Sequence, residues 1–113
     1  MEREFLYTIR NKLNKKYMYS VLEKVGLEPR SKIPVGKYSL GMRQRLAIGQ
    51  AIMENPDILI LDEPMNGLDK NGVQEMRGLF EQMKNEGKLI ILASHNREDI
   101  DVLCDEVYEM ENG

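Results

Sequence analysis

The sequence is poor in residues that build disulfides and metal centres: its 113 residues include one cysteine and one histidine. Cys104 cannot form an internal disulfide, and no CxxC or Cys/His cluster suggests a structural metal site, which fits a reducing cytoplasm. The longest purely apolar stretch, residues 89–93, is far shorter than the roughly 20 residues of a membrane-spanning helix. Residues 1–10 mix charged and apolar side chains and predict no signal peptide. We therefore expect any association with a membrane to depend on a partner protein.

The sequence also lacks the basic excess that nucleic acid binding requires. Its 16 lysines and arginines are outnumbered by 19 aspartates and glutamates, which gives a net charge of −3. We therefore expect no nucleic acid partner. Four basic residues cluster early in the chain, at Arg10, Lys12, Lys15 and Lys16. They could face a phosphate-rich surface, although the solvated face of a helix explains them more simply.

Length and apolar spacing indicate one small domain whose first half is helical. At 113 residues, more than one independent core is not expected. Apolar residues spaced along helix faces predict helices over about 6–13 and 18–25, the second ended by Gly26. Ser39 can cap a third helix, which stops before Pro56. The apolar stripe predicted for this third helix consists of Met42, Leu46, Gly49 and Met53.

The second half of the sequence alternates short apolar runs with helical spacing. Residues 58–61 (ILIL) and 89–93 (LIILA) are continuous apolar runs, typical of strands that are covered on both faces. Asp69 can cap a helix between these strands, and Gly87 can end it. The apolar side of this helix consists of Val73, Met76, Phe80 and Met83.

The order of these elements predicts an α/β fold. A short helix over about 97–103 and a weaker strand near 107–110 extend the alternation to strand, helix, strand, helix, strand. Such an alternation is typical of a parallel sheet with crossover helices. Three strands leave one face or edge of a doubly wound sheet uncovered. We therefore expect part of a larger domain, helical over about 1–54 and belonging to a core sheet over about 55–113.

Two carboxylates follow the first predicted strand. Asp62 and Glu63 come directly after it, and Pro64 follows them. Ligands of open α/β sheets bind at the carboxyl ends of strands, so both side chains are expected in a site. Asp62 suits magnesium, which prefers oxygen ligands, and Glu63 could orient or deprotonate a water that attacks a phosphate. Acidic residues also follow strands simply to start a loop, and the pair alone leaves both interpretations open.

Two further segments carry candidate phosphate contacts. Ser39 and Gly41 stand at the start of a predicted helix, where exposed amide groups and the helix dipole attract anions. Ordinary capping by Ser39 explains the same residues. His95 follows the second predicted strand, at the same end of the sheet as the two carboxylates, and could contact a terminal phosphate or the attacking water. A structural role is the alternative for a lone histidine.

Together these segments resemble the ABC ATPase family. Residues 38–42 (YSLGM) look like its signature motif, and residues 58–64 (ILILDEP) look like its Walker B strand with the catalytic glutamate. Residues 66–69 (NGLD) are similar to its D-loop, and His95 is similar to its switch histidine. The resemblance covers about residues 5–113 and implies a partial ABC ATPase fold of the P-loop NTPase type. The early helices would form the helical subdomain that packs against a membrane subunit, and the later strands would complete the ATP-binding core.

The sequence departs from the family pattern in two ways. The usual signature has glycine and glutamine where this chain has Leu40 and Met42, a combination that resembles exporters of drugs and peptide antibiotics. Nothing in the 113 residues matches the phosphate-binding loop G-x-x-x-x-G-K-[ST], called Walker A, and the glutamine loop is also missing. Gly36-Lys37 and Gly87-Lys88 both lack the required neighbours.

The resemblance implies an ATPase subunit that couples ATP binding and hydrolysis to transport, with export as the expected direction. In the family, two such domains dimerise head to tail around two ATP molecules. Ser39 and Gly41 would then serve ATP held by the partner subunit. Asp62, through magnesium, and Glu63 and His95, as catalytic residues, would serve ATP held in cis.

Asp69, in the D-loop-like segment, would help couple these two nucleotide sites. The implied partners are a second ATP-binding subunit and a membrane-spanning subunit, which would hold the chain at the cytoplasmic face of the membrane. Because Walker A is missing, we expect the isolated chain to be inactive or nearly so. Two alternatives remain: a non-catalytic fragment that docks on a membrane subunit or a full-length ATPase, and a soluble ABC ATPase that acts outside transport.

Overall fold

The computed structural model describes residues 15–95, and the elements in this part follow the predicted order. They are α1 (Lys15–Lys24), the 3-10 helix η2 (Val35–Lys37), α2 (Leu40–Met53), β1 (Ile58–Asp62), α3 (Lys70–Asn85) and β2 (Leu89–Ala93). The helices and strands predicted between residues 18 and 93 are therefore confirmed. The helices expected over about 6–13 and 97–103, and the strand near 107–110, lie outside the described residues.

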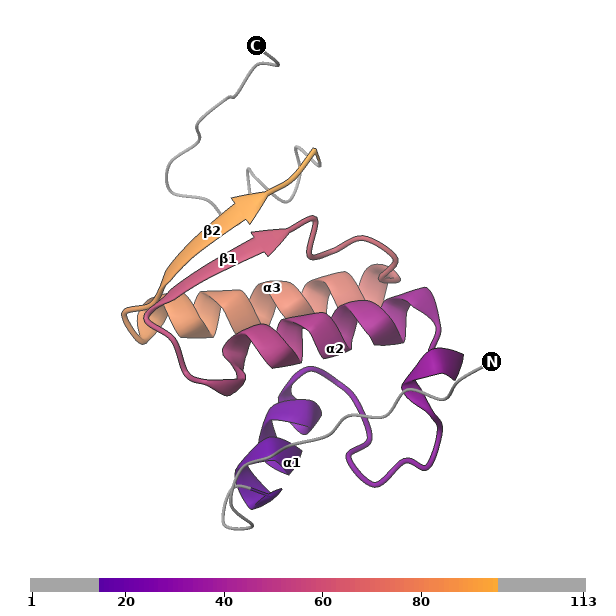
Figure 1. The fold of residues 1–113 in the computed structure, drawn as a ribbon. Coiled ribbons are helices and arrows are strands. Elements are labelled where there is room, and N and C mark those ends of the chain that lie inside the picture. Colours follow the sequence, from indigo (N-terminus) through magenta and orange to yellow (C-terminus); the bar gives the residue numbers. More distant parts are fainter. Residues whose placement is uncertain (1–14, 96–113) are drawn as a thin grey trace.

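The two strands of the described part form a parallel pair, as predicted. Their register runs from Ile58 opposite Leu89 to Asp62 opposite Ala93, and α3 connects the strands. Figure 1 shows three layers: the strands, then α2 and α3 side by side, then α1 beyond α2. The first turns of α2 and α3 lie at the end of the molecule where both strands finish (Figure 1). This arrangement brings the candidate residues at helix starts and strand ends to one side of the fold.

The core lies between the strands and the helices and covers only one face of the described strand pair. Leu59 and Leu61 alternate into the core, where they are 2% and 7% exposed. The opposite face is exposed, and its large apolar residues are Ile58, Ile60, Leu89 and Ile91. The prediction that each strand is covered on both faces is therefore wrong for the described residues. The sequence predicted that one face or edge of the sheet would remain uncovered, and within residues 15–95 one face of the strand pair is exposed.

Helix α2 is buried more widely than its predicted stripe. Its buried residues are Leu46, Ile48, Gly49 and Ile52. Ile48 and Ile52 lie outside the predicted stripe, whose end members Met42 and Met53 are half-buried. The reason is that α2 lies in the middle layer and contacts both α1 and β1. A helix packed on two sides buries more than one face.

The helix ends match their sequence signals. Ser39 caps α2, with its hydroxyl accepting from the Met42 amide at 3.1 Å. Gly26 and Gly87 follow α1 and α3 with φ of +83° and +90°, the left-handed region that favours glycine at helix ends. Among residues 15–95, no helix combines the length and apolar character needed to cross a membrane.

Candidate functional site

The carboxyl ends of β1 and β2 bring Glu63 and His95 together. The backbone amide of His95 donates to Oε1 of Glu63 at 2.8 Å, and Nε2 of His95 lies 3.8 Å from the same oxygen. The His95 side chain is fully exposed, and the Glu63 side chain is 36% exposed. A carboxylate and an imidazole thus meet at the edge of the sheet, within reach of a ligand in solvent.

Glu63 has an unusual backbone conformation. Its φ is +45°, in the left-handed region, where a residue with a Cβ is disfavoured by roughly 1–2 kcal/mol. The conformation is held by neighbours: the Glu63 amide donates to the Ala93 carbonyl at 2.7 Å, which extends the strand pairing by one step. The Glu63 carbonyl in turn accepts from the Asn66 amide at 3.1 Å. Strain that surrounding contacts maintain in this way is common at functional sites.

Asp62 ends β1 on the exposed face of the sheet. It alternates with the buried Leu61 and lies on the same face as Ile58 and Ile60. Within residues 15–95, no group of three or more acidic, histidine or cysteine side chains could enclose a metal ion. A lone carboxylate nevertheless fits magnesium, which keeps several waters and is often held by one or two carboxylates together with phosphate oxygens. Asp62 could therefore hold this ion only alongside a nucleotide.

The start of α2 packs against the loop that precedes α3. A Cβ at Gly41 would lie 3.0 Å from the carbonyl oxygen of Gly67, so a side chain at position 41 would press on this loop. Gly67 has φ of +82°, and a Cβ there would lie 2.6 Å from Cγ of Leu40. The leucine that departs from the usual signature thus occupies space that a glycine in the D-loop-like segment leaves open. The structure places the signature-like and D-loop-like segments in direct contact.

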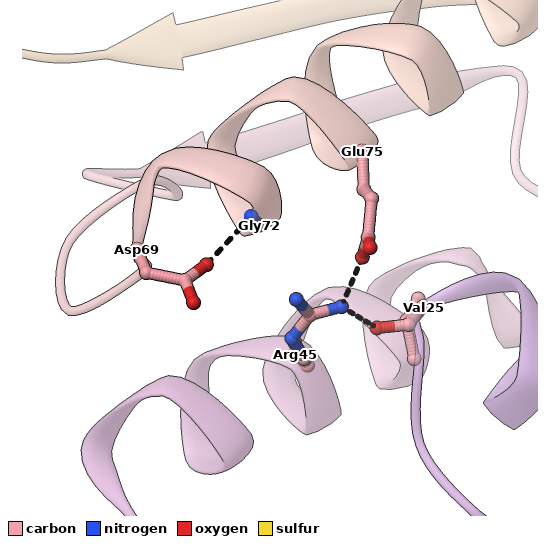
Figure 2. Close-up of polar contacts among 5 residues, drawn as sticks. All are labelled: Val25, Arg45, Asp69, Gly72 and Glu75. Atoms are coloured by element: carbon pink, nitrogen blue, oxygen red, sulfur yellow. Dashed lines mark hydrogen bonds and ion pairs between the residues drawn. The ribbon is translucent and has the colours of Figure 1, made fainter.

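Asp69 caps α3, as predicted. Its Oδ1 accepts from the Gly72 amide at 2.7 Å (Figure 2). We expect Asp69→Ala to lower the free energy of unfolding by about 1 kcal/mol, because a first-turn amide loses its acceptor. Urea denaturation followed by circular dichroism measures this loss. Asp57→Ala is the matched control, since Asp57 is 97% exposed and lies 3.6 Å from Lys88. Equal losses in the two variants would contradict the capping role.

Two residues of α2 that the sequence reasoning missed connect the candidate site to the rest of the fold. Nε2 of Gln44 donates to the carbonyl of Glu63 at 2.8 Å, across 19 positions of the sequence. Arg45 is next to it and reaches both the turn that follows α1 and helix α3. A signal was available in the spacing, because Gln44 lies one helical turn before Ile48 and Arg45 lies one turn before Gly49. Polar residues in register with apolar positions of a helix are expected to be partly buried and to have partners.

The Arg45 guanidinium connects α2 to α3 and to the turn that follows α1. Nη1 donates to the Val25 carbonyl at 2.9 Å and pairs with Oε2 of Glu75 at 2.7 Å (Figure 2). A Cβ at Gly26 would lie 2.1 Å from Nη1, and a Cβ at Gly72 would lie 2.9 Å from Nη2. The guanidinium therefore fills a space that these two glycines leave free. We call this cluster the Arg45 junction.

The structure thus divides the predicted site residues into two groups. Glu63 and His95 contact each other at the strand ends, with Asp62 next to them in sequence and on the open face of the sheet. Ser39 caps α2, and Gly41 packs on the loop that leads to Asp69. Gln44 connects the groups, because it belongs to the helix that Ser39 caps and binds the Glu63 carbonyl.

Comparison with known sequences finds one family over the first part of the chain and related proteins over most of it. The profile of the ABC transporter family matches residues 3–66. An uncharacterized ABC transporter ATP-binding protein of Bacillus subtilis is 50% identical over 81% of this chain and 42% of its own length. The lantibiotic transport ATP-binding protein SrtF of Streptococcus pyogenes is 47% identical, over 75% of this chain and 37% of its own. The bacitracin transport ATP-binding protein BcrA of Bacillus licheniformis is 49% identical, over 77% of this chain and 29% of its own.

Solved structures show the same fold. The dimeric ABC transporter cassette MJ0796 superposes with a TM-score of 0.74 at 23% identity, over 87% of this chain and 43% of that one. The same cassette in a post-hydrolysis state with ADP and phosphate gives a TM-score of 0.71 at 25% identity, over 88% and 42% of the two chains. The chain therefore spans less than half the length of the relatives and structures that it matches.

Proposed function

This chain belongs to the ABC transporter family, and from this membership we propose that it forms part of an ATP-binding subunit whose ATP hydrolysis drives transport, with export as the direction. The observation that best supports the proposal is the contact between Glu63 and His95 where the two parallel strands end. Ligands of open α/β sheets bind at this edge. The site residues predicted for ATP held in cis therefore lie where a nucleotide would be expected.

Within the cis half-site, each side chain has a distinct proposed role. Asp62 would hold magnesium, which when bound would neutralise charge on the phosphate oxygens. Glu63 would orient or deprotonate the attacking water, and His95 would contact the terminal phosphate. The carboxylate of Glu63 is fixed by the His95 amide at 2.8 Å. A base that is held in place in this way loses little freedom when the water binds.

The second half-site would serve ATP held by a partner subunit. Ser39 is exposed at the start of α2, and its hydroxyl oxygen accepts from the Met42 amide at 3.1 Å. Its hydrogen therefore remains available for a phosphate oxygen. The helix dipole and the small Gly41 favour the approach of an anion to the same turn. Asp69 follows the loop that packs on Gly41 and would transmit a change from one half-site to the other.

The partners proposed for the subunit follow from this division. ATP held by the other subunit requires a second ATP-binding subunit in a head-to-tail dimer. A transport function requires a membrane-spanning subunit, which would keep the chain at the cytoplasmic face of the membrane. Two similar proteins are named for the transport of lantibiotics and bacitracin. Together with Leu40 and Met42 in the signature-like segment, these names favour a peptide antibiotic or a similar compound as substrate.

We expect the isolated 113-residue chain to bind Mg-ATP weakly or not at all. These residues contain no glycine-rich loop or lysine to surround the β- and γ-phosphates. Phosphoryl transfer depends on positioning and charge stabilisation, which carboxylates and a histidine cannot supply alone. Isothermal titration calorimetry should show no saturable heat at millimolar nucleotide. A micromolar dissociation constant would contradict this prediction.

A mixing experiment tests the proposed function itself. The exposed strand face of Ile58, Ile60, Leu89 and Ile91 is the apolar surface that remaining parts of an ABC domain would cover. We expect the chain to hydrolyse ATP when combined with a polypeptide that carries a Walker A loop with its strand and helix. A complex that forms but stays inactive would instead favour the alternative of a non-catalytic docking fragment.

A further inference from the structure

We propose that Gln44 is a positioning residue that fixes the Glu63 peptide and thereby links the two half-sites of one chain. The inference rests on the proposed function, because it assumes that Glu63 acts on the attacking water. Gln44 binds Glu63 at its backbone carbonyl and not at its carboxylate. Its role would therefore be to hold the peptide from which the catalytic side chain extends.

Gln44 donates to the peptide of Glu63, whose backbone conformation is unfavourable without supporting contacts. Glu63 has φ of +45°, and its carbonyl accepts from two donors, Nε2 of Gln44 at 2.8 Å and the Asn66 amide at 3.1 Å. Both bonds hold the carbonyl in the orientation that the left-handed conformation gives it. A rotation of this peptide toward the ordinary strand conformation would break both bonds. The rotation would also move the Glu63 side chain away from the His95 amide.

Gln44 belongs to the same helix that Ser39 caps, so its hydrogen bond connects the two proposed half-sites. Gln44 lies five positions after Ser39, about 7.5 Å along the helix axis at 1.5 Å per residue. Ser39 caps the same helix and would serve the partner's ATP. A shift of α2 when the partner's nucleotide binds would therefore act directly on the Glu63 carbonyl. The bond is half-buried, so water does not easily replace it.

Amide hydrogen exchange on the full chain, without nucleotide, tests the positioning role. In Gln44→Met, which removes the donor but keeps an apolar side chain of similar length, the amides of His95 and Asn66 should exchange roughly tenfold faster. Amides inside α3, such as Phe80, should keep their rates. Gln44→Glu should have the same local effect, because it places a carboxylate opposite the carbonyl. Gln50→Met and Gln50→Glu are the matched controls, since Gln50 is an exposed residue of the same helix.

Two exchange results would overturn the proposal. One is unchanged exchange at His95 and Asn66 in both Gln44 variants. The other is equal acceleration of all core amides, including Phe80, which would indicate a general loss of stability. Because nucleotide is absent from this experiment, its outcome does not depend on whether the chain supports ATP hydrolysis.

Kinetics in the mixed complex provide the second readout. With the Walker A-bearing polypeptide, Gln44→Met should lower kcat by about tenfold and leave KM for ATP unchanged. A raised KM with an unchanged kcat would contradict a role in placing Glu63. An inactive complex of the unmodified chain would count against the proposed function, while the exchange experiment would still decide for or against Gln44.

Discussion

The substitution Glu63→Gln is expected to lower ATP hydrolysis by about 10²–10⁴-fold in the complex with a Walker A-bearing polypeptide. Glutamine has the shape of glutamate and keeps an oxygen that can accept from the His95 amide. It cannot accept a proton from the attacking water, so the loss is expected in kcat. The measurement is the rate of phosphate release at saturating Mg-ATP.

The fold should tolerate this change, which makes the result interpretable. The 2.8 Å bond from the His95 amide and the backbone bonds of Glu63 do not require a charge. We therefore expect the thermal unfolding midpoint of Glu63→Gln to match that of the parent chain. Glu23→Gln removes the same charge from an exposed position in α1 and should leave hydrolysis unchanged. A Glu63→Gln complex with the activity of the parent complex would show that this carboxylate is not the base.

The elements between residues 18 and 93 could be predicted because their signals are local. A continuous apolar run such as residues 58–61 fits a buried strand, and Ser39 and Asp69 mark the helix starts that they cap. Their pairing also followed, because strands joined by a helix are usually parallel. The apolar pattern could not reveal which face of the strand pair packs against the helices. Ile60 is 73% exposed and Leu59 is buried, although both lie in the same continuous apolar run.

The candidate site could be predicted only as far as the residue types at strand ends and helix starts. The left-handed φ of Glu63 has no local signal, because glycine or asparagine usually marks that conformation. It depends on Gln44 and Ala93, which lie 19 and 30 positions away in the sequence. Contacts over such separations form only when the layers assemble. The sequence therefore predicted the candidate groups at the strand ends but not the residue that holds the Glu63 peptide.

The departure at Leu40 shows the same limit. From the sequence, leucine in place of glycine weakens the resemblance to the signature motif. In the structure the Leu40 side chain lies against Gly67, and a Cβ at Gly67 would be only 2.6 Å from Leu40 Cγ. The two positions are compatible because the loop residue has no side chain. The leucine in the signature-like segment thus depends on Gly67 in the D-loop-like segment. Neither segment alone indicates this dependence.

The Arg45 junction is expected to dominate the stability of the described part, and Arg45→Ala should lower the free energy of unfolding by about 3 kcal/mol. The Arg45 side chain is 16% exposed and donates to the carbonyl of the buried Val25 at 2.9 Å. The substitution leaves this carbonyl without its donor and empties the space between Gly26 and Gly72. Urea denaturation followed by circular dichroism measures the loss.

Two control variants separate the parts of this loss. Glu75 is 55% exposed, and exposed ion pairs contribute little, so Glu75→Gln should cost less than about 1 kcal/mol. Arg43→Ala removes the same side chain from an exposed position two residues earlier, where it donates to the Gly36 carbonyl at 3.1 Å. It should also cost less than about 1 kcal/mol. Equal losses for the two arginines would contradict a junction at Arg45. A large loss of unfolding free energy in Glu75→Gln would instead assign the stability to the ion pair. It would contradict the argument that the unpaired Val25 carbonyl and the lost packing cause most of the loss in Arg45→Ala.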